Sequence, residues 1–336
     1  MRIAACLTGQ LRTGLCPAPE LGNALTSLES FYENVLRRLH QPDVFVVLDD
    51  AMHPESLGQV RNLLKPVMLH LESERNVSSA WRKTLHHINQ SGAPDPQCAR
   101  SAWPTRNGFA QAHRLQICWR AVVTRERGMG RAYDYVLRSR PDLLFSAPLA
   151  LIGLIHFQDR ATAQPTMRCV QRVRNNLLCQ SRMQSCTNGP FGLLTSAGIM
   201  NTILYDGFYL AARWLAPPLF DPLELALCTN LRCANAAAGC RSNVSECMPP
   251  KHRDLPLATV ADGRAVPVGN EGLHALALGQ YLSTNNDSSL RIRYLNRNES
   301  ATTFSFAPGK WPASCALDEH AYPCTKPRCA TMSVSG

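Results

Sequence analysis

Apolar and polar positions alternate in blocks along the first half of the chain, and each block predicts one element. The apolar run Arg2–Thr8 ends at Gly9 and predicts a buried strand. Further apolar runs or helical stripes predict strands at Asp43–Leu48, Val67–Leu71 and Tyr133–Arg138 and helices at Leu28–Leu39, from Pro54 and at Gly108–Arg127. Strands that alternate with helices favour an α/β fold with a mostly parallel sheet flanked by helices.

The second half of the chain has a weaker pattern. Residues Glu72–Arg106 are polar and contain two glycosylation sequons, so we expect a long excursion or lid there. Beyond it we expect short strands and helices at Leu177–Cys179, Phe191–Leu194, Ser196–Leu204, Asn270–Leu282 and Leu290–Leu295. The sequence therefore predicts a single domain over residues 1–306, with a nucleotide-binding half (1–150), an acceptor-side half (151–306) and a Pro/Cys-rich tail (307–336).

Charge and composition narrow the classes of partner. An apolar content of 45% is enough for a true core, and the net charge of +10 suits an anionic ligand. The basic residues form no Lys/Arg run and are mostly arginine, which binds phosphate oxygens well. A phosphate-bearing small molecule is therefore favoured over nucleic acid, which is the weakest of the partners considered.

Fourteen cysteines indicate disulfide bonds rather than metal binding. No CxxC pair or zinc-finger spacing occurs, and the cysteines cluster in an insertion at 228–254 and in the tail. Cys-rich loops of this kind, together with five Asn-x-Ser sequons, predict a glycoprotein of the Golgi or secretory lumen. Reduced, scattered thiols are the alternative.

The opening residues bear on the same question. Arg2–Leu7 is too short for the apolar core of a signal peptide, and no stretch predicts a transmembrane segment or anchor. A cytoplasmic location therefore stays open.

Polar residues follow three of the predicted strands. In an open α/β sheet, ligands bind outside the carboxyl ends of the strands. The residues at these ends are Thr8, Gly9, Gln10 and Arg12 at the end of the first strand, Asp49 after the second, and Arg138, Arg140 and Asp142 at the end of the fourth, Tyr133–Arg138. Carboxylates bind Mg²⁺ or Mn²⁺, and arginines bind phosphate oxygens bidentately. Ordinary roles remain for each group: a permissive turn at Gly9, a helix cap at Asp49 and surface ion pairs for the arginines.

Several of these segments resemble a family of glycosyltransferase-like proteins from eukaryotes, algae and viruses. MRIAACLTGQLR resembles the opening RIAVCLTGQLR of that family, and DVFVVLDD resembles its second strand. YDYVLRSRPDLLF resembles its most specific signature, a YD followed by three apolar residues and R-x-R-P-D. NGPFGLLTS resembles its N-D-x-F-A motif more weakly. Similarity covers about residues 2–50, 107–145 and, weakly, 175–300.

The resemblance implies a GT-A-like (Rossmann-like) fold, a nucleotide-sugar donor and a divalent cation, Mn²⁺ or Mg²⁺. It implies a glycosyltransferase that moves a sugar to a glycan or glycoprotein acceptor. Asp142 would then take the place of the metal-binding carboxylate, although Arg140 interrupts a D-x-D motif. Gly189 stands where the family motif has an acid, so Glu271 is the replacement base that we name. These two departures keep open a catalytically degenerate binding module on the same fold.

Overall fold

The computed structural model describes much of the first half of the chain and short segments of the second. The described residues are 1–11, 17–18, 23–39, 41–50, 54–90, 106–145, 148–149, 167–170, 183–185, 192–196, 207–222, 274, 278, 281 and 291–295. The chain falls into two compact units. The first comprises Met1–Glu74, Ala121–Phe157 and Asn296–Gly336, and the second comprises Arg75–Arg120 and Gln158–Leu295. The predicted extent of a single domain over 1–306 stays a prediction.

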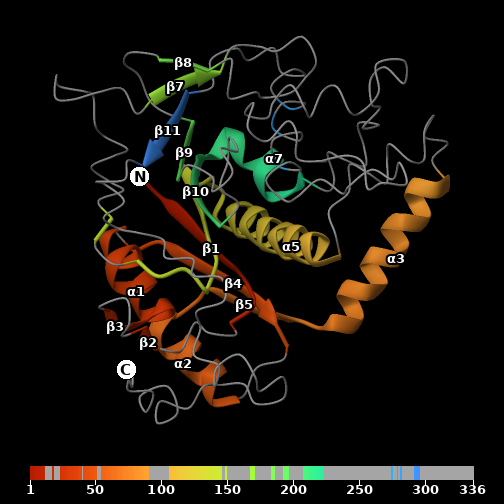
Figure 1. Cartoon of the computed structure of the whole chain (residues 1–336), viewed down its shortest axis with the longest axis horizontal. Coiled ribbons are helices and arrows are strands. Elements are labelled where there is room, and N and C mark those ends of the chain that lie inside the picture. Colours follow the sequence, from red (N-terminus) through yellow and green to blue (C-terminus); the bar gives the residue numbers. More distant parts are fainter. Residues whose placement is uncertain are drawn as a thin grey trace, which may run out of the picture. The chain divides into compact units, whose positions relative to one another are not determined.

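Four adjacent parallel strands form the centre of the first unit (Figure 1). They are β1 (Ile3–Gly9), β4 (Asp43–Asp49), β5 (Met68–Glu72) and β6 (Tyr135–Ser139), in the order β5-β4-β1-β6. Each neighbouring pair is parallel, so the four carboxyl ends lie at one edge of the sheet. Every residue of the central strand β1 is buried, as expected for a parallel sheet covered on both faces.

Helices cover this sheet, and a small hairpin precedes the first of them. The elements are β2 (Pro17–Ala18), β3 (Asn23–Thr26), α1 (Ser27–Asn34), the short 3₁₀ helix η2 (Leu36–Arg38), α2 (Pro54–Leu64) and the end of α5 (Arg106–Met129). β2 and β3 pair antiparallel. The side chain of Asn34 in α1 donates to the backbone oxygen of Phe145 at 2.6 Å, and Ser30 accepts from the backbone nitrogen of Phe145 at 3.0 Å. These bonds hold α1 against the segment that follows β6.

Helix α1 begins with a capping box. The hydroxyl of Thr26 accepts from the backbone nitrogen of Glu29 at 3.1 Å, and the Glu29 carboxylate accepts from the backbone nitrogen of Thr26 at 2.9 Å. Two of the amide groups that a helix start leaves unpaired are thereby satisfied.

We expect Thr26→Ala to lower the free energy of unfolding by about 1 kcal/mol, because one capping bond is lost at a buried helix start. Urea denaturation followed by circular dichroism measures the change. Thr26→Ser, which keeps the hydroxyl, serves as the control. A loss in the serine variant as large as in the alanine variant would contradict the assignment of the effect to the cap.

The second unit contains shorter strands with mixed pairing. Its elements are α3 (Glu74–Gln90, of which Glu74 belongs to the first unit), β7 (Met167–Val170), β8 (Met183–Ser185), β9 (Leu193–Ser196), β10 (Phe208–Ala212), η4 (Arg213–Leu215), α7 (Ala216–Phe220) and β11 (Arg291–Leu295), with the start of α5. β9 pairs parallel with β11 and antiparallel with β10, while β7 pairs antiparallel with β11 and β8. Aromatic rings pack beside these strands: Tyr209 meets Phe220 at 5.3 Å between ring centroids, and Trp119 stacks on Phe220 at 5.9 Å.

The predicted α/β class with a mostly parallel sheet and flanking helices is confirmed. In the first unit, the four parallel strands begin and end within two residues of the predicted ones, while the short strands β2 and β3 were not predicted. The excursion or lid expected at 72–106 contains a regular helix that was not predicted, α3 at Glu74–Gln90, and its remainder at 91–105 lies outside the described residues. Val77 of this helix is buried, and Trp81 packs on Phe109 with ring centroids 5.0 Å apart.

Predictions for the second unit have mixed outcomes. The expected strands near 191–194 and 290–295 correspond to β9 and β11. Ser196 ends β9, and residues 197–204 of the helix expected there lie outside the described residues. Within the expected helix 270–282, the described residues His274, Leu278 and Tyr281 are helical. The expected strand 177–179, the Cys-rich insertion and the tail lie outside the described residues.

Candidate functional site

Strand register determines which side chains share a face at the carboxyl edge of the parallel sheet. Register partners in neighbouring parallel strands project to the same face, and so do residues two apart within a strand. Thr8 is paired with Val47, Val47 with His70, and Asp49 with Glu72. On the other side of β1, Arg138 is paired with Cys6. One face of the sheet therefore becomes polar toward the carboxyl ends of its strands.

We call this group the polar edge, and it comprises Thr8, Asp49, His70, Glu72 and Arg138. The other face of the same strands is apolar over nearly its whole length: Ile3, Ala5, Leu7, Val44, Val46, Leu48, Leu69, Leu71 and Leu137. Polar groups also occur elsewhere, with Asp43 at the amino end of β4 and Ser139 of β6 on the other face. The polar side chains nevertheless gather on one face near the carboxyl ends, which suits a ligand site.

Two residues of the polar edge, Arg138 and Thr8, are deeply buried. Arg138 has no exposed surface, and Thr8 is 2% exposed. Within the described part of the chain, the Thr8 hydroxyl has no hydrogen-bond partner. Buried hydroxyls are normally hydrogen-bonded, so this one is an acceptor and donor that a ligand could use.

Close contact joins the end of β1 to the turn after β6. Gly9 has a φ of +149°, and a Cβ at this position would lie 2.9 Å from Cδ of Pro141. The turn itself is closed by a bond from the backbone nitrogen of Leu143 to the oxygen of Arg140 at 3.4 Å. Proline is favoured at the second position of such a turn. Glycine at position 9 therefore lets the turn that carries Asp142 approach the end of β1.

Arg140 and Asp142 form a bidentate ion pair within this turn. Nε of Arg140 donates to Oδ1 of Asp142 at 2.9 Å, and Nη2 donates to Oδ2 at 2.5 Å. Both carboxylate oxygens are therefore engaged by a guanidinium whose planar fork matches them. A metal ion at Asp142 would have to displace Arg140 from at least one oxygen.

Among the described residues, the side chains at the polar edge and the turn after β6 do not fit a divalent cation in this arrangement. Within the described ranges, no group of three or more histidine, cysteine, aspartate or glutamate side chains is placed to hold a metal ion. Mg²⁺ uses one or two carboxylates together with substrate phosphates, and the carboxylate named for that role already binds an arginine. The metal role of Asp142 stays a prediction.

The sequence-predicted residues are thus brought together in part. Thr8 and Gly9 end β1, Asp49 ends β4, and Arg138, Arg140 and Asp142 belong to β6 and the turn after it. Gln10 follows β1 directly and is partly exposed. Arg12, Gly189 and Glu271 lie outside the described residues. The catalytic assignment of Asp142 and Glu271 is therefore not tested.

Residue-level reasoning missed His70 and Glu72. Nε2 of His70 lies 2.7 Å from Oε2 of Glu72, whose side chain is 4% exposed, while that of His70 is 41% exposed. The backbone oxygen of Glu72 also accepts from the backbone nitrogen of Asp50 at 3.2 Å. The signal was present in the alternation Met68-Leu69-His70-Leu71-Glu72, which puts both polar residues on one face.

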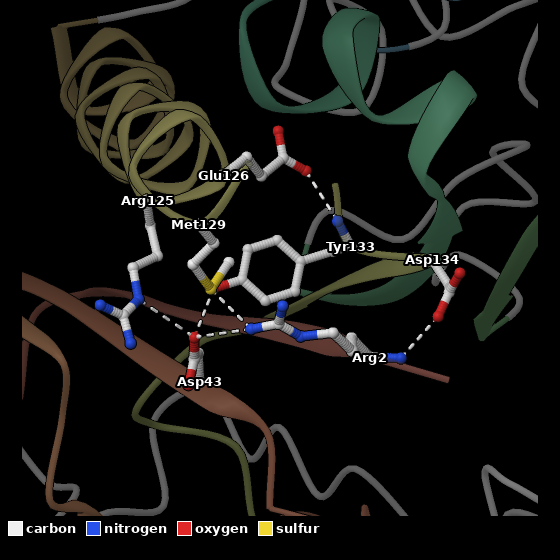
Figure 2. A network of polar contacts seen from close by, with 7 residues as sticks. All are labelled: Arg2, Asp43, Arg125, Glu126, Met129, Tyr133 and Asp134. Carbon is white, nitrogen blue, oxygen red and sulfur yellow. Dashed lines mark hydrogen bonds and ion pairs between the residues drawn. The ribbon is translucent and has the colours of Figure 1, made fainter. Parts of the chain in front are cut away.

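A second polar network lies at the opposite, amino end of the strands (Figure 2). The phenol of Tyr133 donates to Oδ2 of Asp43 at 2.5 Å, and Nε of Arg125 donates to the same oxygen at 3.4 Å. The guanidinium of Arg2 lies 3.9 Å from this oxygen and 5.4 Å from the centre of the Tyr133 ring. Glu126 accepts from the backbone nitrogen of Tyr133 at 3.0 Å. This network fastens the last turns of α5 to the starts of β4 and β6, away from the polar edge.

Burial of the Tyr133 ring, and then its bond to the Asp43 carboxylate, raise the pKa of this phenol well above the ordinary value. The phenol therefore keeps its proton and acts as a donor in this network. Its role is structural, because its bond to Asp43 fastens the segment before β6 to the start of β4.

Disulfide bonds and membrane-spanning helices are the structural features that relate to the expected cellular location of the protein. Cys6 in β1 and Cys118 in α5 each take part in a disulfide bond. The cysteine clusters of the insertion and the tail lie outside the described residues. Among the described helices, none has the length and apolar character to cross a membrane. The Golgi or secretory location stays a prediction.

Comparisons with known proteins add little to this geometry. No protein-family model matches the sequence, and no curated protein matches it either. Among solved structures, the apo form of mouse xyloside xylosyltransferase 1 matches with a TM-score of 0.30 and 10% identity, covering 88% of this chain and 85% of that chain. A TM-score this low supports no argument about function, and the sequence resemblance to glycosyltransferase-like proteins stays untested.

Proposed function

We propose that this chain is a GT-A-like glycosyltransferase that binds a nucleotide-sugar donor at the polar edge and transfers the sugar to a glycan or glycoprotein acceptor. The observation that supports it is the gathering of Thr8, Asp49, Arg138 and Arg140 at the carboxyl ends of adjacent parallel strands. Open α/β sheets bind nucleotides at this edge. A basic chain with a net charge of +10 also suits an anionic donor.

Each residue has a defined role in this proposal. Thr8, Gly9 and Gln10 border the nucleotide, and Asp49 accepts from the ribose or the base. Arg138 and Arg140 neutralise the diphosphate, which must leave with the bonding electron pair when the sugar is transferred. Arg12 and Glu271 complete the proposal as a further phosphate contact and as the base that deprotonates the acceptor.

A non-catalytic nucleotide-sugar binding module is the second candidate. It is favoured by the Arg140–Asp142 ion pair, which engages both oxygens of the carboxylate that the resemblance assigns to the metal. It is also favoured by Gly189 in place of an acid. Both candidates use the same site, so binding and turnover must be measured separately.

Calorimetry with a panel of UDP-, GDP- and CMP-sugars, with Mn²⁺ and with EDTA, tests the shared claim. Release of the free nucleotide then separates the candidates. Binding with turnover supports the transferase, and binding without turnover supports the module. Absence of binding by any donor would contradict both.

Asp142→Ala provides a sharper test of the turn after β6. Without its carboxylate partner, Arg140 is released toward the diphosphate and one negative charge is removed from the site. We therefore expect nucleoside diphosphate to bind about threefold to tenfold more tightly, the effect of about 1 kcal/mol of removed repulsion. Calorimetry in EDTA measures it, and Arg140→Ala should weaken binding instead.

Glu55→Ala, which removes an exposed carboxylate in the first turn of α2, is the matched control and should leave binding unchanged. If Asp142→Ala instead abolished a metal-dependent donor hydrolysis that the parent chain shows, Asp142 would be a metal ligand and the proposed role of the ion pair would be wrong.

A further inference from the structure

Position along the sheet separates His70 and Glu72 from the residues assigned to the diphosphate. Arg138 lies in β6, at one side of the strand order β5-β4-β1-β6, and His70 lies in β5, at the other. Three strand spacings separate these strands, or roughly 14 Å. An extended nucleoside diphosphate covers a comparable length. If the diphosphate lies at β6 and β1 and the ribose reaches Asp49 in β4, the base lies over β5.

The contact between Glu72 and His70 determines the hydrogen-bonding character of the ring. A carboxylate oxygen of Glu72 accepts in this contact, so the neutral tautomer of His70 that makes it carries its proton on Nε2 and has Nδ1 as an acceptor. Among the described residues, Nε2 is the ring atom that is engaged, and the half-exposed ring leaves Nδ1 to solvent or a ligand. The contact with the nearly buried Glu72 carboxylate holds the orientation of the His70 ring.

An acceptor in this place discriminates among bases. Uracil and guanine each present a ring N–H on the edge that pairs with other bases, whereas adenine and cytosine present an unprotonated ring nitrogen there. An Nδ1 acceptor can accept a hydrogen bond from the ring N–H of uracil or guanine. The same acceptor faces a lone pair on the ring nitrogen of adenine or cytosine. Polar groups that match one ligand and leave another unpaired are an effective source of specificity.

We propose that His70, positioned by Glu72, is a specificity-determining residue that selects a nucleotide whose base carries a ring N–H, uracil or guanine, over adenine and cytosine. This inference rests on the proposed nucleotide site. It adds the class of base to a site for which the proposed function names no preference among bases.

The experiment compares binding of UDP, GDP, ADP and CDP by calorimetry, with inorganic diphosphate as a probe that has no base. We expect the unchanged chain to bind UDP or GDP at least about tenfold more tightly than ADP and CDP. His70→Phe keeps a ring and removes the acceptor. It should weaken binding of the preferred nucleotide about threefold to tenfold, the usual effect of one neutral hydrogen bond, and leave inorganic diphosphate unchanged.

Glu72→Gln tests the positioning role separately. The amide is similar in shape but can also donate to Nε2, so the ring is free to take the other tautomer and to present Nδ1–H. Discrimination between the two kinds of base should therefore shrink, mainly through tighter binding of ADP and CDP. A merely structural role would weaken all four nucleotides equally. His86→Phe, at an exposed histidine of α3, is the matched control.

Different results would overturn the role of His70 and the proposed nucleotide site. Binding of all four nucleotides with equal affinity, or a preference that survives both His70→Phe and Glu72→Gln, would overturn the role of His70 and leave the nucleotide site in place. Failure of every nucleotide and of diphosphate to bind would overturn the site itself. A preference for ADP or CDP in the unchanged chain would reverse the assignment of Nδ1 as acceptor.

Discussion

Gly9→Ala is expected to lower the free energy of unfolding by about 2–4 kcal/mol, because it combines backbone strain with a steric overlap in a packed region. The φ of +149° at Gly9 is one that residues with a side chain rarely adopt. The added methyl group would lie 2.9 Å from Cδ and 3.5 Å from Cγ of Pro141. Pro141 is buried and its ring is rigid, so the overlap cannot be relieved by rotating a side chain.

The same substitution should also disturb ligand binding. Relief of the overlap moves Pro141, and with it the turn that holds Arg140 and Asp142 beside the end of β1. We therefore expect weaker binding of nucleoside diphosphate even in the fraction of molecules that is folded. Chemical denaturation measures the first effect, and calorimetry well below the unfolding transition measures the second.

Gly58→Ala in α2 is the control for the chemical change itself. Apart from its chain neighbours and the backbone of its own helix, no atom lies within 4 Å of the position that its Cβ would take, and its backbone is helical. Alanine in such a position should be neutral or stabilising by up to about 1 kcal/mol. Equal stability of the Gly9 and Gly58 variants would show that β1 and the turn after β6 do not meet as described.

Much of the first unit could be predicted from local sequence. The runs that form β1 and β4 are continuously apolar because both faces of a parallel strand are buried, and each ends where a polar residue or glycine follows. The helical stripe of α5 and the proline that opens α2 are equally local signals. These features depend on a few neighbouring residues, and sequence alone supplies them.

Features that depend on partners in space were harder to predict. The polar composition of α3 predicts an excursion, although Val77 and Trp81 repeat at helical spacing. In the second unit, β7 and β8 are short and pair antiparallel, and nothing in four residues of sequence indicates the partner. The short length of these segments and their pairing with residues far away in the chain, rather than their composition, make such strands hard to predict from sequence.

The candidate site shows the same division. Thr8, Asp49 and Arg138 could be named because each ends or nearly ends a predicted strand. Their common face follows only from the register of the strands, as does the place of His70 among them. The Arg140–Asp142 ion pair joins residues two apart in a turn, and its geometry depends on a backbone that sequence does not specify. The metal-binding role assigned to Asp142 requires a carboxylate that is not already paired, and sequence alone could not show that Arg140 pairs with it.

Asp43→Ala is expected to produce the second large loss of stability, about 2–3 kcal/mol, because it removes the acceptor on which the network in Figure 2 converges. Its Oδ2 accepts from the phenol of Tyr133 at 2.5 Å and from Arg125 at 3.4 Å, with Arg2 at 3.9 Å. The Asp43 side chain is 22% exposed, so water replaces it only in part. Alanine leaves a phenol and two guanidinium groups without their shared acceptor.

Asp134→Ala is the matched control for Asp43→Ala. Its carboxylate belongs to the same network, where it accepts from the backbone nitrogen of Arg2 at 2.6 Å, but its side chain is 46% exposed. Solvent screens and replaces such a contact, so we expect a loss below about 0.5 kcal/mol. Thermal and urea unfolding of both variants gives the comparison. Equal losses would mean that burial of the Asp43 carboxylate does not set the strength of the network.

Titration of Tyr133 gives an independent check of this network. Its raised pKa means that the unfolded chain loses the phenolic proton first as the pH rises past the ordinary tyrosine value of about 10. The folded state then binds more protons than the unfolded state, so the free energy of unfolding falls with rising pH above that value. Asp43→Ala removes one of the two main causes of the raised pKa, and burial alone remains. The titration of Tyr133, followed by ultraviolet absorbance against the Tyr133→Phe variant, should therefore begin at lower pH in Asp43→Ala, and an unchanged titration would show that burial alone holds the proton.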